Sequence, residues 1–140
     1  MGYDIDENHH QSHAAPPAPP KPGASVAALV HEAGWNSHAH GFWEGGWNDG
    51  EKVALVHSEA SELLEEIRMR PKSGDHQAGW MRTMRYREDG KPEGVPSEAA
   101  DVVIRMMDFC AYHGIDLERA ILEKMAYNRS RPHMHGGKAF

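Results

Sequence analysis

The sequence contains one cysteine, Cys110, among its 140 residues. A single thiol cannot form a disulfide within the chain, so a disulfide-stapled secreted fold is excluded and a reducing compartment is favoured. Long apolar runs are also missing, since no stretch approaches the roughly 18 consecutive apolar residues of a membrane-spanning helix. Residues 1–13 lack the charged-then-apolar pattern of a secretory signal. We therefore expect a cytoplasmic protein without a membrane partner.

Positive charge is scarce as well. The chain has 15 Lys and Arg against 21 Asp and Glu, which gives a net charge of -6. Proteins that bind the phosphate backbone of DNA or RNA carry a basic stripe or patch. A nucleic-acid polymer is therefore not an expected partner. The length corresponds to about one small domain.

Proline is concentrated at one end of the chain. Five of the nine prolines fall between Pro16 and Pro22, and no periodic apolar residues accompany them. Such a segment cannot bury a core. We expect residues 1–23 to form a disordered Pro- and His-rich tail and residues 24–140 to form one domain.

Four segments have the apolar spacing of helices, namely residues 24–38, 48–70, 96–114 and 117–131. Asn48 is a good N-cap with Glu51 three residues later, Asp116 can cap the last segment, and Pro71 ends the second. The turn-rich residues 71–94 contain WMRTMRYR, which fits a short helix or a strand. The expected class is all-α, a short helical bundle that requires no regular strand.

Two acidic pairs at helical spacing are the most informative feature. Glu59 and Glu62 form one pair, and Glu98 and Asp101 form the other. Residues three apart share a helix face, so each pair places two carboxylates side by side. A shared Mg²⁺ or Mn²⁺ would offset their repulsion, because these cations take oxygen ligands. Such pairs also occur on solvated helix faces, which is the plainer interpretation.

The second acidic pair belongs to a longer polar stripe on an otherwise apolar helix. The stripe continues through Arg105, Asp108 and Tyr112 at spacings of three and four. A helix that is apolar on most sides is buried, and an unpaired buried charge is costly. We therefore expect the stripe to face a site or the charges of a partner.

The last expected helix carries Lys124, Asn128 and Arg131 on one face. Lys and Arg there could neutralise phosphates, and Arg can hold one bidentately. The alternative is an ordinary basic face near a helix C-terminus, where cations are favoured in any case.

Three segments together carry a resemblance to a known family. They are GEKVALVHSEASELLEE, EAADVVIRMMD and the closing GIDLERAILEKMAYNRSRPHMHGGKAF. Over roughly residues 36–140 the chain resembles the MazG-like family of all-α nucleoside triphosphate pyrophosphohydrolases, whose metal motifs are ExxE and ExxD in this order.

The resemblance implies a four-helix bundle that completes its core by forming a dimer or tetramer. It implies the reaction NTP + H₂O → NMP + PPi, with two or three Mg²⁺ or Mn²⁺ ions. The implied metal ligands are Glu59, Glu62, Glu98 and Asp101. Glu62 would also orient or deprotonate the attacking water, with Glu66 as the reserve candidate.

The resemblance also implies a substrate pocket. Lys124, Asn128 and Arg131 would hold the phosphates, and the base-binding candidates are Asn36, Phe42, Trp43 and Trp47. For the three aromatic residues, hydrophobic packing that caps the bundle is the alternative. One branch of the family, encoded by phages that replace adenine with 2-aminoadenine, hydrolyses dGTP, which makes a purine dNTP the first expected substrate. The long segment between Glu62 and Glu98 departs from many members. It carries Arg82, Arg85 and Arg87, and it could be a lid over the phosphates, an oligomer contact or a mobile loop.

Three other classes compete with this interpretation. A di-iron bundle would need Glu-x-x-His on its helices, and that spacing occurs only at Glu7 and His10, in the tail. A zinc site could use the pairs His38–His40 and His133–His135, although neither has a cysteine partner. A non-catalytic helical module that binds a nucleotide or a protein would leave the acidic stripe solvated or paired with its partner.

Overall fold

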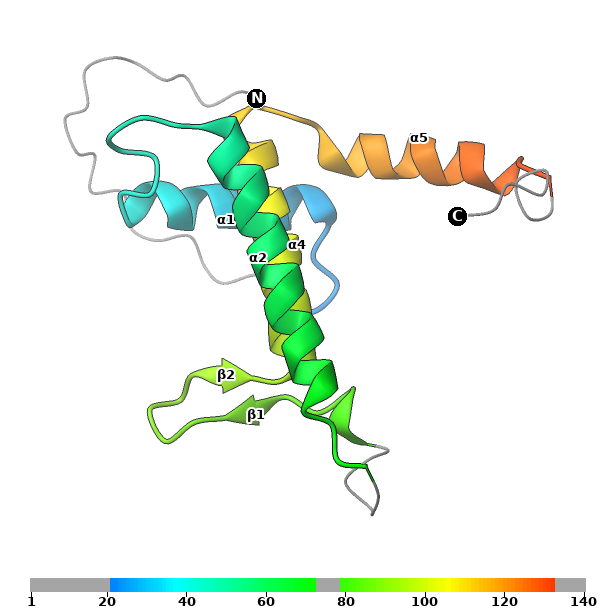
Figure 1. Ribbon diagram of the computed structural model, residues 1–140. Coiled ribbons are helices and arrows are strands. Elements are labelled where there is room, and N and C mark those ends of the chain that lie inside the picture. The colour runs from blue at the N-terminus through cyan, green and yellow to red at the C-terminus, as the bar shows by residue number, and fades with distance from the viewer. Residues whose placement is uncertain (1–20, 73–78, 133–140) are drawn as a thin grey trace.

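The computed structural model describes residues 21–72 and 79–132 (Figure 1). Within these ranges the chain forms helices α1 (Val26–Ala39), α2 (Asp49–Arg68), α4 (Val95–Tyr112) and α5 (Leu117–Arg129). A two-stranded antiparallel ribbon, β1 (Arg85–Tyr86) and β2 (Pro92–Glu93), lies between α2 and α4. The all-α class is confirmed. None of the described helices has the length and apolar character needed to cross a membrane.

Side-chain caps fix three of the helix starts. Ser25 accepts a hydrogen bond from the backbone N–H of Ala28 at 3.1 Å, and Asn48 accepts one from the N–H of Glu51 at 3.1 Å. Asp116 caps α5 in the same way. Each cap satisfies a backbone donor that has no partner inside its helix. The starts predicted at Asn48 and Asp116 are therefore confirmed.

Helix α4 packs against both α1 and α2, and Figure 1 shows α2 running alongside α4 while α1 crosses them. The crossing with α1 is close at Gly34, where an added Cβ would lie 2.5 Å from the Cβ of Ala111. The buried residues of α4 include Met107 and Cys110. Because both residues at this crossing are small, the backbones of α1 and α4 approach closely there.

Burial of α4 is incomplete on its remaining side. Val103 is 50% exposed and Ile104 is 46% exposed, so the expectation that most of this helix is buried holds only where α1 and α2 cover it. Helix α5 has no buried residue and projects away from the other helices in Figure 1. It contacts α1, where the N–H of Ala27 donates to Glu118 Oε2 at 3.0 Å.

The segment between α2 and α4 is anchored to the last turns of α2. Arg85 donates two hydrogen bonds to the Glu66 carboxylate, at 2.8 and 3.0 Å, and its guanidinium lies 4.2 Å from the centre of the Trp80 ring. The Trp80 indole donates to the backbone carbonyl of Glu66 at 2.9 Å. Part of WMRTMRYR, Arg85–Tyr86, is thus a strand. Of the tail expected at residues 1–23, residues 1–20 lie outside the described residues.

Candidate functional site

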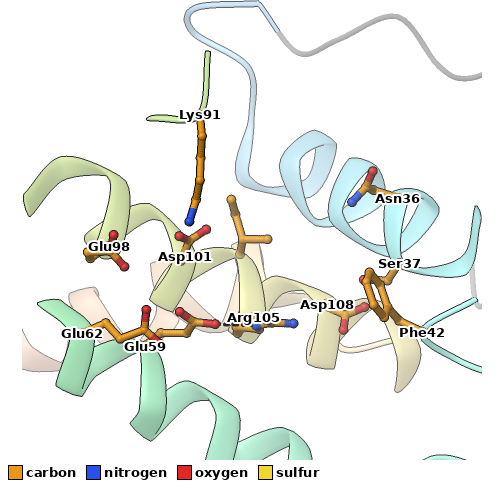
Figure 2. Close-up of a pocket in the computed structure, with 11 residues that line it drawn as sticks. Asn36, Ser37, Phe42, Glu59, Glu62, Lys91, Glu98, Asp101, Arg105 and Asp108 are labelled. Atoms are coloured by element: carbon orange, nitrogen blue, oxygen red, sulfur yellow. Dashed lines mark hydrogen bonds and ion pairs between the residues drawn. The ribbon is translucent and has the colours of Figure 1, made fainter. Parts of the chain in front are cut away.

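Carboxylates from two helices converge on one pocket, as Figure 2 shows. Glu59 and Glu62 extend from α2 and Glu98 from α4, and one ligand oxygen of each lies within 4.8 Å of the others. Asp101, one helical turn beyond Glu98, lines the same pocket. The structure therefore brings all four predicted metal-ligand candidates together.

The cluster carries negative charge that the chain only partly balances. Burial raises the pKa of Glu98, and the neighbouring Asp101, Glu62 and Glu59 raise it further. Burial also raises the pKa of Asp101, as does Glu59, whereas Arg105 and Lys91 lower it. Raised carboxyl pKa values mean that the ionised form is disfavoured here, so a cation bound among these oxygens would relieve the repulsion.

Arg105 holds one of the four carboxylates in place. Its Nε donates to Glu59 Oε1 at 2.9 Å, and Glu59 is only 9% exposed. A buried carboxylate needs such a partner, because desolvation without compensation is costly. Glu62, by contrast, is exposed to solvent. The two glutamates of the ExxE pair thus differ: one is fixed by an ion pair and the other is accessible.

A lysine enters the pocket from the ribbon. Lys91 lies just before β2, after the turn at Asp89 and Gly90, and its side chain points towards Asp101 in Figure 2. Asp89 steadies this turn, since its Oδ1 accepts from the N–H of Lys91 at 3.1 Å. The positive charge of Lys91 therefore stands at the edge of the carboxylate cluster.

The opposite end of the pocket has a different character. It is lined by Asn36 and Ser37 of α1, by Phe42 of the following loop and by Asp108 of α4. Asp108 is 5% exposed and its Oδ1 accepts a hydrogen bond from the indole of Trp43 at 2.9 Å. The cavity encloses about 300 Å³, at the lower end of the range for small-molecule sites.

Only part of the predicted base-binding set lines this pocket. Asn36 and Phe42 do, and the Phe42 ring is 56% exposed. Trp47 instead stacks on Tyr112 with ring centres 3.8 Å apart, and Trp43 meets Tyr112 edge-on at 5.3 Å. The two tryptophans therefore contribute packing, and Trp43 also donates to the pocket's buried carboxylate.

The predicted phosphate-binding residues lie elsewhere in the chain. Lys124, Asn128 and Arg131 are exposed on or just after α5 and do not line the pocket of their own chain. The reserve catalytic candidate, Glu66, is occupied by the two hydrogen bonds from Arg85. Of the possible zinc ligands, His40 bonds the backbone oxygen of Asn36, and His133 and His135 lie outside the described residues.

Lys91 was not predicted as a site residue, and Arg105 and Asp108 were predicted only as members of a polar stripe. The stripe expectation holds for four of its five members, since Glu98, Asp101, Arg105 and Asp108 line the pocket, whereas Tyr112 stacks on Trp47 instead. An Asp-Gly turn before Lys91 is a hairpin signal, and it could have indicated that this lysine returns towards α4.

Comparison with protein-family models, with curated proteins and with solved structures gives no match for this chain.

Proposed function

We propose that this protein is a metal-dependent nucleoside triphosphate pyrophosphohydrolase, which converts NTP and water to NMP and pyrophosphate. The observation that carries the proposal is the convergence of Glu59, Glu62 and Glu98 within 4.8 Å, in a pocket that Asp101 also lines. These residues belong to the ExxE and ExxD motifs through which the chain resembles the MazG-like family. Their carboxylate oxygens are the donors that Mg²⁺ and Mn²⁺ require, so the donor set fits either ion.

Two or three Mg²⁺ or Mn²⁺ ions at these carboxylates would neutralise the polyphosphate and lower the pKa of the attacking water. Side chains of the protein would perform the other steps of catalysis. Glu62, the exposed member of the cluster, orients that water and accepts its proton. Arg105 keeps the Glu59 carboxylate directed into the pocket through its 2.9 Å ion pair. Lys91 supplies positive charge to phosphate oxygens from the ribbon side.

Exposed apolar side chains support a homo-oligomer, a dimer or a tetramer, as part of the proposal. On α4, Val103 and Ile104 are exposed, and on α5, Leu122 is 62% and Met125 is 55% exposed. A helix is stabilised mainly by packing its apolar face against another protein surface, and α5 has no buried residue within its own chain. Packing of α5 on a second subunit is the route by which its Lys124 could reach a pocket, since Lys124 does not line the pocket of its own chain.

The resemblance favours a purine deoxynucleoside triphosphate, dGTP first, as substrate. The reaction would then serve control of nucleotide pools, or synthesis of a modified base in a phage-infected cell. The enzyme would act in the cytoplasm, because both roles use the soluble nucleotide pool.

The proposal is tested by comparing two glutamate-to-glutamine variants on the same helix. Glu62→Gln should lower metal-dependent pyrophosphate release by roughly 10²- to 10⁴-fold, the usual contribution of a positioned general base. Glu65→Gln is the matched control, since Glu65 pairs with Arg68 on the exposed face of α2. Equal turnover by the two variants, or release that persists in EDTA, would contradict the proposed chemistry.

A further inference from the structure

Asp108 is a buried carboxylate at the end of the pocket farthest from the acidic cluster. It follows Asp101 by seven residues and Glu98 by ten on α4, which places it about 10–15 Å along the helix at 1.5 Å per residue. In Figure 2 Arg105 lies between Asp108 and the glutamates. Asp108 therefore belongs to a separate subsite of the same pocket.

The surroundings of Asp108 are suited to a flat polar ring. Phe42 offers an exposed aromatic face, and Asn36 offers an amide donor and acceptor at the same end of the pocket. Asp108 itself is 95% buried, in that only 5% of its surface is exposed. The described part of the chain supplies it with one side-chain donor, the indole of Trp43. An ionised carboxylate has about four lone-pair sites, so it can still accept further hydrogen bonds from a ligand.

A carboxylate accepts hydrogen bonds and donates none, and this decides which base it can recognise. Guanine presents two adjacent donors, N1–H and the 2-amino group, that match the two oxygens of one carboxylate. Adenine and cytosine place an acceptor nitrogen beside their amino group, and uracil and thymine flank a single N–H with carbonyls. Each of these would set a lone pair against a buried negative charge, which is costly.

We propose that Asp108 determines base specificity by accepting hydrogen bonds from N1–H and the 2-amino group of guanine, with Phe42 stacked on the ring. This inference rests on the proposed function, because it assigns the base end of the nucleotide whose phosphates meet the acidic cluster. Trp43 is a positioning residue: its hydrogen bond to Oδ1 fixes the plane of the carboxylate. The distance between the two ends of the pocket lets one nucleotide reach both.

The test compares kcat/KM for dGTP, dITP and dATP with Mg²⁺. Inosine keeps N1–H and lacks the 2-amino group, so dITP loses one of the two hydrogen bonds. A hydrogen bond to a charged buried group corresponds to roughly ten- to hundredfold in rate, so the wild-type enzyme should prefer dGTP over dITP by that factor. It should reject dATP at least as strongly.

The Asp108→Asn variant keeps the shape of the side chain and an oxygen for the Trp43 indole. The oxygen held by the Trp43 indole still accepts from N1–H, and the new NH₂ group faces the 2-amino group of guanine. The kcat/KM for dGTP should therefore fall roughly ten- to hundredfold, and the dGTP/dITP ratio should approach unity. A merely structural defect would lower kcat/KM for all the nucleotides by the same factor and leave this ratio unchanged. Asp116→Asn is the matched control, since asparagine also caps a helix well.

Two results would overturn the inference and leave the proposed function intact. One is metal-dependent hydrolysis by the wild-type enzyme without a preference for dGTP over dITP. The other is an Asp108→Asn variant that keeps the wild-type ratio. Absence of pyrophosphate from every triphosphate would instead refute the proposed function, and the assignment of Asp108 with it.

Discussion

Replacing Glu98 by glutamine should stabilise the metal-free protein, although it removes a metal ligand. When Glu98 is ionised, one of its carboxylate oxygens lies within 4.8 Å of a carboxylate oxygen of Glu59 and of Glu62. Coulomb's law at that distance gives about 0.9 kcal/mol per pair in water and about 3.5 kcal/mol at an effective dielectric constant of 20. Solvent screening of these partly exposed groups favours the lower value. Because Arg105 already compensates Glu59, we expect a net gain of about 1 kcal/mol in the free energy of unfolding.

The stability of the folded protein should depend on pH because the pKa of Glu98 is raised. Its folded pKa lies above the ordinary value of 4.5, so protonation favours the folded state. The stabilisation from protonating Glu98 is fully present below pH 4.5 and is lost as the pH rises through the folded pKa. The Glu98→Gln variant lacks this step, so its advantage over the wild-type protein should grow as the pH is raised towards 7.

Thermal unfolding at pH 7 in EDTA, and again with Mg²⁺ or Mn²⁺, measures both effects. In EDTA the Glu98→Gln variant should melt roughly 3–5 °C above the wild-type protein. At a metal concentration of 100 Kd the wild-type protein should gain about 2.7 kcal/mol and the variant much less, which reverses the order. Glu65→Gln should show neither effect. A Glu98→Gln variant that is less stable in EDTA, or that is stabilised by metal as much as the wild-type protein, would refute the reasoning.

Three further substitutions test other parts of the structure. Lys91→Ala should raise KM for the triphosphate roughly tenfold with the melting temperature nearly unchanged, because an exposed lysine contributes charge rather than packing; Lys72→Ala is its control. Arg85→Ala should cost about 3 kcal/mol in denaturant unfolding, since it leaves the Glu66 carboxylate without its partner. Gly34→Ala should destabilise by about 1–3 kcal/mol, because the new methyl would collide with Ala111. An unchanged KM, or unchanged unfolding midpoints, would contradict the corresponding argument.

Local signals predicted the helices well. Asn48 with Glu51, and Asp116 before Leu117, are caps whose hydrogen bonds lie within four residues, so the sequence alone determines them. The helix expected over residues 48–70 ends at Arg68 in the structure, close to Pro71. The two-residue strands were harder to predict, because the anchor that holds them is Glu66, nineteen positions from Arg85.

The acidic half of the candidate site could also be predicted from the sequence. Spacing of three residues on a helix fixes which carboxylates share a face, and the two pairs meet because α2 and α4 pack together. The other half depends on longer-range geometry. Lys91 reaches the pocket through the path of the ribbon, and Trp43 bonds Asp108 across 65 positions. Periodicity within one helix carries no information about such contacts.

Helix α5 is the element whose apolar face the described part of the chain leaves uncovered. Its apolar spacing predicts a helix, which is confirmed at Leu117–Arg129, but Ile121, Leu122 and Met125 remain exposed. The site roles of Lys124, Asn128 and Arg131 therefore stay predictions, which the oligomeric state in solution would inform. A monomer by light scattering at working concentrations would remove the route by which these residues could reach a pocket.

The most direct measurement is the identity of the products formed from dGTP and from a panel of other triphosphates, with Mg²⁺, with Mn²⁺ and with EDTA. The account predicts a nucleoside monophosphate and pyrophosphate in equal amounts, only when a divalent metal is present. No product from any triphosphate, or release of a diphosphate and inorganic phosphate, would contradict it.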